Sequence, residues 1–342
     1  MLQRYGAEYA LQVPELLDKQ IATTNQRIQE GLIHPSKISK INKSFAEDLK
    51  NRYNVDVELE KSLGKSTFDL FVPERNLFID LNPAVSHNSL MSFACIKNSC
   101  ASDCTKHSPV GNTYHKNRAK LAHDNDVSLV QIYDWDLSSI HRFLHGKLAS
   151  NFVKLSAKRL SLVSISQRDA NEFLSRYHIQ GGTNKQTHCY GLVCDNELLA
   201  VATFGPSRFN KNYDYEFIRY AVKTGYIIHG ASARLFKAFL NDAQPSSVVS
   251  YVDFDHTTKQ HTFLNTLGFK ETYSSGPTLA WFNLSKQHHV SNLSLSLVGA
   301  DRLLGTSYGP VSESGLNNKD ILLKEQYLPV YTSGNRVFVW QE

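Results

Sequence analysis

The fold of this chain is decided by the stretch FDLFV at residues 68–72, PERN at 73–76 and LFIDLN at 77–82. The first and last pieces are short apolar runs of the kind that form strands, and the piece between them has the composition of a turn. Each apolar run carries one acidic residue, Asp69 in the first and Asp80 in the second. The sequence therefore predicts a two-stranded hairpin with one carboxylate on each strand.

Two carboxylates on neighbouring strands suit a divalent cation, because Mg²⁺ favours one or two carboxylates together with water and phosphate oxygens. A bound ion of this kind neutralises charge at a phosphate and activates a water, as phosphodiester hydrolysis requires. His87, which follows Asn82 closely in the sequence, is placed to act as the base. The alternative interpretation is that Asp69 and Asp80 only form caps or salt bridges at strand ends.

The bulk composition is that of an ordinary folded protein. The chain has 342 residues, which predicts two or three domains, and it is 41% hydrophobic and 20% charged. No apolar run approaches the ~18 residues of a transmembrane helix, and the N-terminus lacks a signal-peptide core. We therefore expect a cytoplasmic protein without a membrane partner, in the bacterial host cytoplasm if a phage encodes it. The net charge of +5 permits DNA binding without arguing for it.

Three of the five cysteines lie close to one histidine, with the spacing Cys95-x4-Cys100-x3-Cys104-x2-His107. Thiolates and imidazole at such short spacing suit tetrahedral Zn²⁺, which would order a polar segment. The alternative is a loop that holds three reduced cysteines. The odd and small number of cysteines argues against a disulfide scaffold.

The first part of the chain predicts an α-β-β-α-β order. Residues 1–43 are polar with a helical pattern, and 44–150 form a first globular unit. Ser44 is placed to cap the opening helix of that unit, with Glu47 at the capping-box position. The further elements expected are strands near 66–72 and 76–81, a helix over about 113–125 and a strand over 128–133.

A second unit spans 155–285 and predicts a mixed sheet with helices on both faces, so the fold class is α/β. Its hairpin turn lies at 195–197. The last part, 286–342, reads as a linker followed by a terminal hairpin, with strands at 328–331 and 336–340.

The motifs of the first unit resemble those of phage homing endonucleases. The residues that carry the resemblance are FDLFVP from Phe68, LFIDLN from Leu77, His87, Tyr114-His115-x-Asn117 and LVQIYD from Leu129. Those proteins have a nuclease core similar to the very-short-patch-repair endonucleases of the PD-(D/E)xK superfamily. The opening residues 4–12 resemble one partial copy of the DNA-binding-like repeats that precede such nucleases.

This resemblance implies a restriction-endonuclease-like core with a Mg²⁺ or Mn²⁺ ion. It makes Asp69 the principal metal ligand, and Asp80 completes the inner shell. It implies that His87 and His115 act as the base or contact phosphate, and that Glu47 assists from the first helix.

The second unit resembles the second domain of the same phage proteins, with a GNAT acyltransferase fold similar to the phage DNA-modification acyltransferase Mom. The residues concerned include His178-Ile-Gln-Gly181-Gly, Glu216-x-x-Arg219 and Ser250-Tyr-Val-Asp253. The resemblance implies that a helix beginning at Gly230-Ala231-Ser232 receives the pyrophosphate of an acyl-CoA on its free amides. The family's Q/R-x-x-G-x-G/A pattern lacks its leading polar residue here, so a scaffold or DNA-contacting role is the alternative.

Basic side chains are spread over both units, and we expect those most suited to DNA phosphates to be Arg118, Arg208, Lys211 and Arg219. Solvated surface charge is the alternative interpretation. Asp253 follows a buried strand and precedes His256, which predicts either a substrate-facing pair or a loop Asx turn.

The sequence thus predicts a metal-dependent endonuclease that hydrolyses phosphodiester bonds of double-stranded DNA. One alternative is a GNAT-type acyltransferase that modifies DNA bases or another substrate. A further alternative is a DNA-binding protein with a decayed nuclease, because Asn82 stands where the superfamily usually has a lysine, and an amide does not supply that charge.

Overall fold

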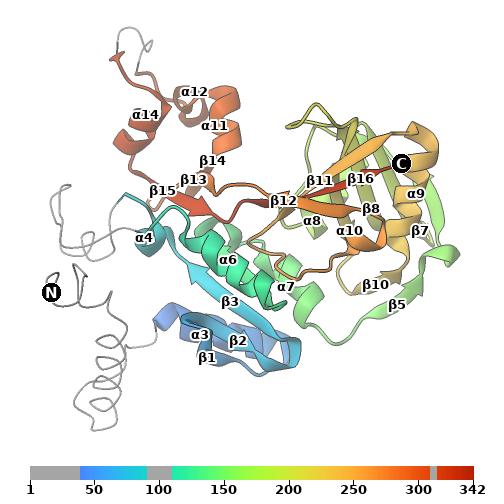
Figure 1. The fold of residues 1–342 in the computed structure, drawn as a ribbon, viewed down its shortest axis with the longest axis horizontal. Helices are drawn as coiled ribbons and strands as arrows, with labels where there is room; N and C mark the ends of the chain where they lie inside the picture. The colour runs from blue at the N-terminus through green and yellow to red at the C-terminus, as the bar shows by residue number, and fades with distance from the viewer. Residues whose placement is uncertain (1–38, 91–109, 309–313) are drawn as a thin grey trace, which may run out of the picture. The chain divides into compact units, whose positions relative to one another are not determined.

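The computed structural model describes residues 39–90, 110–308 and 314–342 (Figure 1). Contacts between Cα atoms divide the chain into Met1–Phe45 and Ala46–Glu342, and the sheets all belong to the second of these units. The Cys95, Cys100, Cys104 and His107 cluster lies outside the described residues, as does nearly all of the helical segment expected over 1–43.

The predicted carboxylate hairpin is confirmed. Strands β2 (Ser66–Val72) and β3 (Leu77–Asn82) pair antiparallel, with Leu70 opposite Ile79. Between them lies one turn of 3₁₀ helix, Pro73–Arg75, which ends at Asn76 with φ 44°. A left-handed backbone of this kind suits asparagine better than most residues. The turn composition read from the sequence therefore forms the turn observed.

The hairpin belongs to a four-stranded sheet of order β1-β2-β3-β4, in which β3 and β4 are parallel and the other pairs are antiparallel. A helix before β1 and a helix between β3 and β4 complete the predicted α-β-β-α-β order. The bounds are α3 (Lys40–Tyr53), β1 (Glu58–Leu63), α6 (Tyr114–Asp124) and β4 (Ser128–Tyr133). The added strand β1 escaped prediction because its residues alternate between exposed and half-buried and include no apolar run.

The capping box expected at Ser44 and Glu47 does not form. Helix α3 begins at Lys40, so Ser44 is an interior helical residue and Glu47 is exposed on the helix surface. The backbone N–H of Asn42 donates instead to the hydroxyl of Ser39, at 3.0 Å.

A seven-stranded mixed sheet follows, with the order β12-β16-β11-β9-β8-β7-β6. Helices α8 and α9 cover its opposite faces, because successive side chains of a strand point to opposite sides. Tyr190 of β7 packs with Phe239 of α9, whereas its neighbour Cys189 packs with Phe173 of α8. The bounds are β6 (Ser161–Ser164), α8 (Gln167–Tyr177), β7 (His188–Cys194), β8 (Glu197–Pro206), β9 (Tyr215–Val222), α9 (Ala231–Ala243), β11 (Ser247–Asp253), β12 (Lys270–Ser274) and β16 (Asn335–Gln341).

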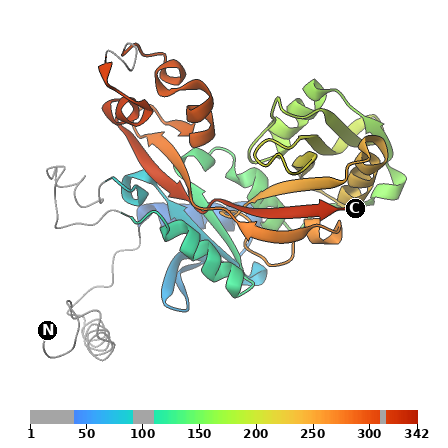
Figure 2. The ribbon, with the colours of Figure 1, turned by 45° about the horizontal axis from the view of Figure 1, so that its top comes forward.

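The terminal hairpin expected from the sequence does not form either, because its two strands belong to different sheets. Both strands form, but β15 (Tyr327–Thr332) pairs with β13 (Thr278–Asn283) in a three-stranded sheet, while β16 inserts between β11 and β12 (Figure 2). The red strand of Figure 2 that ends at the C-terminus is therefore an interior strand of the larger sheet. The three-stranded sheet also contains β14 (His288–Ser291), and the helices of this part are α11 (Asn292–Val298), α12 (Ala300–Leu304) and α14 (Asn318–Lys324).

The remaining elements are short, and the two strands among them pair in parallel as a two-stranded sheet. They are α4 (Ala84–His87), α7 (Ile140–Leu148), β5 (Val153–Ser156), β10 (Tyr226–His229) and α10 (Phe263–Thr266). Among the described residues, no helix has the length and apolar character needed to cross a membrane.

The interior position of β16 predicts a large loss of stability on truncating its core side chain. Phe338 has no exposed surface and packs in the main core cluster. Phe338→Ala should lower the free energy of unfolding by about 3–5 kcal/mol in urea denaturation. Phe209→Ala is the matched control, because Phe209 is 55% exposed. Equal losses for the two variants would contradict the placement of β16.

Candidate functional site

A cavity of about 430 Å³ lies where strands β9 and β11 separate. The two strands are parallel, but they pair only at Tyr215 with Val248 and Glu216 with Val249, near their first residues. Beyond these pairs they diverge toward their carboxyl ends, and the cavity opens between them. Ligands of open α/β sheets bind at such strand ends, and this volume is that of a small-molecule site.

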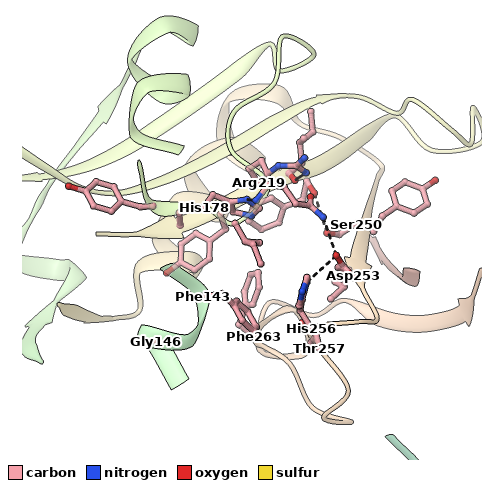
Figure 3. A pocket seen from close by; sticks show the side chains of 18 of the residues that line it. Phe143, Gly146, His178, Arg219, Ser250, Asp253, His256, Thr257 and Phe263 are labelled. Atoms are coloured by element: carbon pink, nitrogen blue, oxygen red, sulfur yellow. Dashed lines mark hydrogen bonds and ion pairs between the residues drawn. The ribbon is translucent and has the colours of Figure 1, made fainter. Parts of the chain in front are cut away.

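Four parts of the chain place polar side chains around this cavity (Figure 3). Arg219 comes from β9 and Asp253 ends β11, while His178 follows α8 and His256 lies in the loop after β11. Figure 3 shows these four side chains directed into one region. Residues far apart in the sequence therefore meet at one site.

Asp253 and His256 form an ion pair in the wall of the cavity. The Nδ1 atom of His256 lies 3.1 Å from Oδ2 of Asp253, and the amide of Gln180 donates to the same oxygen at 3.3 Å. The other oxygen of Asp253 accepts the N–H of Asp255 at 2.9 Å, which is an Asx turn. Asp253 therefore forms both the pair with His256 and the Asx turn, which were alternatives in the sequence. That the pair faces a substrate stays a prediction.

The proton of this pair stays on the imidazole. Burial lowers the pKa of His256, but the charge and hydrogen bond of Asp253, together with the charges of Asp136 and Asp255, raise that pKa to about 9. Burial raises the pKa of Asp253, and the same pairing brings it below its ordinary value. His256 is therefore an imidazolium at neutral pH, and its buried Nε2–H makes no hydrogen bond to any described residue.

His178 is the neutral histidine of the site. Burial, followed by the nearby charge of Arg219, lowers its pKa to about 3. Its Nδ1 accepts the backbone N–H of Gln180 at 3.1 Å, so the ring carries its proton on Nε2. Sequence reasoning quoted His178 and Gln180 only for a resemblance and gave neither a role. The feature of the sequence that could have drawn attention to them is the pair of glycines that follows. Gly181 adopts φ 65° in the turn after His178, where its N–H donates to the His178 carbonyl.

The predicted cofactor residues Gly230, Ala231 and Ser232 lie at the start of α9. Gly230 is the N-cap, with φ 78° and no side chain to occupy the first-turn amides. The hydroxyl of Tyr220, which lines the cavity, accepts the N–H of Ser232. Tyr220 therefore links the cavity to this helix N-terminus.

In the first sheet, the predicted metal ligand Asp80 binds Arg118 instead. The guanidinium donates from Nε at 2.5 Å and from Nη2 at 2.9 Å, and both side chains are largely buried. Asp69 accepts the N–H of Leu81 at 2.8 Å. Arg118, expected to contact DNA phosphate, thus neutralises the carboxylate that was expected to hold the metal.

His87 and His115 do lie together. Nδ1 of His87 is 3.1 Å from Nε2 of His115, and Nδ1 of His115 is 2.5 Å from the carbonyl oxygen of Tyr331. Burial lowers the pKa of His87 to about 3 and that of His115 to about 4, so both rings are neutral. No group of three or more His, Cys, Asp or Glu side chains among the described residues is arranged to hold a metal ion.

The other predicted DNA contacts have partners within the second unit. Nε of Arg208 donates to the buried carboxylate of Glu216 at 2.9 Å. The amine of Lys211 donates to the carbonyl of Ser207 at 2.6 Å. Arg219 differs from both, because it lines the cavity.

No protein-family model matches the sequence, and comparison with curated proteins gives no match. Among solved structures, the chain is similar to an N-acetyltransferase from Staphylococcus aureus, with 18% identity, a TM-score of 0.27 and coverage of 34% of this chain and 86% of that one. It is also similar to a GNAT family acetyltransferase from Elizabethkingia anophelis with acetyl-CoA bound, with 11% identity, a TM-score of 0.27 and coverage of 54% and 98%. A third is a polyamine N-acetyltransferase from Drosophila melanogaster, with 8% identity, a TM-score of 0.27 and coverage of 54% and 100%.

These likenesses concern fold alone, and the strands and helices of the chain form the α/β fold expected from the sequence. The prediction of an endodeoxyribonuclease is wrong, because the similar structures are transferases and not hydrolases. Neither the homing-endonuclease core nor the Mg²⁺ or Mn²⁺ cofactor finds support in the comparisons. In the structure the Asp80 carboxylate of the hairpin is paired with Arg118, and its role as a metal ligand stays a prediction.

The ion pair also makes a prediction. Asp80→Asn leaves the Arg118 cation buried without its carboxylate, and should lower the free energy of unfolding by about 3–5 kcal/mol. Asp124→Asn on the same helix as Arg118 is the control, since its pair with Lys120 is exposed and contributes about 1 kcal/mol or less. Urea denaturation should give the same loss with Mg²⁺ as with EDTA. A loss that appears only with Mg²⁺ would show that Asp80 serves the metal.

Proposed function

We propose that this chain is an acyl-group transferase that takes its acyl group from an acyl-coenzyme A, with its active site in the cavity between β9 and β11. The observation that carries the proposal is the His256–Asp253 pair at the carboxyl ends of the separated strands. This pair presents a buried, protonated nitrogen without a partner among the described residues. A charged donor held ready in a cavity is a costly feature unless a ligand meets it.

The start of α9 supports the choice of donor. Helix amides that lack a side-chain cap bind anionic phosphate groups, and Gly230 leaves that approach open because a Cβ there would meet only Ala157, at 4.0 Å. Ala231 and Ser232 follow it in the first turn, although the Ser232 amide already donates to Tyr220. Gly230 and Ala231 would therefore hold the pyrophosphate. Bound acyl-coenzyme A supplies an activated acyl group as a thioester.

Within this proposal the ion pair moves two protons. Nε2 of His256 donates its proton to the departing sulfur, and Asp253 accepts the proton that the attacking amine loses as it bonds to the acyl carbon. Asp253 then releases its proton to solvent and Nε2 of His256 takes one up from solvent, while Nδ1 keeps its proton in the 3.1 Å contact with Asp253. The pair therefore ends each turnover in its starting state. A nucleobase amine of DNA is one acceptor to be tested, alongside small amines.

Loss of the Asp253 charge should abolish this chemistry. With acetyl-CoA and a mixture of amines and DNA as acceptors, Asp253→Asn should release free thiol about 10²-fold or more slowly than the wild type, in the range of a lost acid–base group. Asp195→Asn is the matched control, because Asp195 lies at a hairpin turn outside this cavity. The proposal fails if acetyl-CoA at millimolar concentration gives neither thiol release nor a rise in the unfolding temperature.

The pH dependence gives a second test of the pair. His256 must be protonated to act, so the rate should be high below the pKa of about 9 and fall as pH rises through it. Asp253 is the largest contribution that raises this pKa, and Asp136 and Asp255 add to it. The residual activity of Asp253→Asn should therefore decline at a lower pH than that of the wild type. A profile of kcat against pH with the same alkaline limb in both proteins would remove His256 from this role.

A further inference from the structure

Arg219 is a half-buried arginine whose charge has no carboxylate bound to it. Its Nη1 donates to the carbonyl of Ile218 at 2.8 Å, which is the hydrogen bond that the structure gives it. Its Nε is buried and makes no hydrogen bond to any described residue. Burial and the neighbouring charge of Arg208 lower the pKa of Arg219 to about 10, so the group is still a cation at neutral pH.

Three other arginines, from different parts of the chain, each have a carboxylate partner. Arg118 binds Asp80 through two nitrogens, Arg208 binds Glu216, and Arg336 binds Glu271. In each of these pairs the Nε edge of the guanidinium meets a carboxylate. This edge, formed by Nε and Nη2, has the geometry of a two-oxygen anion. Arg219, which lines the cavity (Figure 3), has no such carboxylate partner in the structure.

The charges around the cavity favour the same ligand. Of the side chains that line it, Arg142, Lys147, Arg219 and His256 are cationic, whereas Asp253 is the one acidic residue among those described. Asp253 is already bonded to His256, Gln180 and the Asp255 amide. The side chains that line the cavity therefore carry an excess of positive charge.

We propose that one of the two reactants carries a carboxylate, and that this carboxylate binds the guanidinium of Arg219 through both oxygens. The proposal deepens the function proposed above, since it names a chemical class for a reactant of that same cavity. A carboxylate accepts hydrogen bonds from two guanidinium nitrogens at once, whereas a neutral carbonyl group offers one oxygen for the two. The carboxylate belongs either to the acyl group or to the acceptor, and the experiment separates these two sources.

The test compares matched pairs of probes on the full chain. For the donor, acetyl-CoA is compared with succinyl-CoA, and for the acceptor, glycine is compared with glycinamide. Binding is measured as the ligand concentration that raises the unfolding temperature, and turnover as thiol release. In one of the two arms the wild type should bind the carboxylate-bearing probe about 10- to 100-fold more tightly than the matched probe that lacks this carboxylate, the range expected of a hydrogen-bonded charge pair.

Two substitutions locate the effect. Arg219→Gln should remove the preference for the carboxylate, and Arg219→Lys should restore only part of it, because an ammonium keeps the charge without the two-point geometry. Arg176→Gln is the control, since Arg176 lies on α8 outside this cavity and pairs with Glu172 on the exposed helix surface. Its preference should equal that of the wild type.

Stability distinguishes a binding role from a structural one. An unpaired buried cation destabilises the fold, so Arg219→Gln should unfold at the same urea concentration as the wild type or at a higher one. A clear fall in that midpoint, or a carboxylate preference that survives Arg219→Gln, would overturn the proposal. Equal binding of the probes with and without the carboxylate, in both arms, would also overturn it.

The failure of this inference differs from the failure of the proposed function. Carboxylate-selective binding without thiol release would leave the Arg219 site standing and remove the acyltransferase. Thiol release with no carboxylate preference in either arm would support the acyltransferase and remove the Arg219 site.

Discussion

The geometry of the cavity depends on one fully buried guanidinium, that of Arg336 on β16. Two of its nitrogens bind Glu271 of β12, at 3.0 and 2.6 Å. The remaining hydrogen bonds go to the carbonyl oxygens of Thr257, Lys259 and Gln260, at 2.6 to 3.1 Å. Because β16 lies between β11 and β12, this side chain ties an outer strand to the loop that leaves β11. His256 is the residue immediately before that loop segment, so its position rests on Arg336.

The same loop is held from its other side by the four-stranded sheet. The hydroxyl of Thr258 donates to the carbonyl of Val127 at 2.7 Å and accepts the N–H of Leu129 at 2.8 Å. Asp255 accepts hydrogen bonds from Gln131 at 3.1 Å and from Tyr133 at 2.9 Å. Burial, then the nearby charge of Asp253, raises the pKa of Asp255 to about 7. The segment that carries the Asp253–His256 pair is thus fixed by two sheets, as preorganised acid–base chemistry requires.

The elements that were predicted correctly are those determined by residues close together in the sequence. The β2–β3 hairpin, the helix at α6 and the mixed sheet followed from alternation and turn composition, and Asp253 with His256 was found because the two residues are three apart. The insertion of β16 between β11 and β12 was missed because its partners are distant in the chain, and a Gly-Asn turn signal favours pairing with the nearer strand. The pairing of Asp80 with Arg118 is equally long-range, 38 residues apart, so sequence reasoning placed the two in separate roles. Gln180 reaches Asp253 across 73 residues, and no local signal announces that contact.

The arginines of this protein show why a residue type alone does not reveal a role. Arg336 has its donors met by Glu271 and by backbone carbonyls, and Arg118 has its Nε edge met by Asp80. Groups satisfied in this way hold the fold, since any exchange of partners would leave a buried charge bare. Arg219 and the Nε2 of His256 are the opposite case, because each keeps a buried donor without a partner among the described residues. Both residues lie on the walls of the cavity between β9 and β11, where the proposed reactants bind.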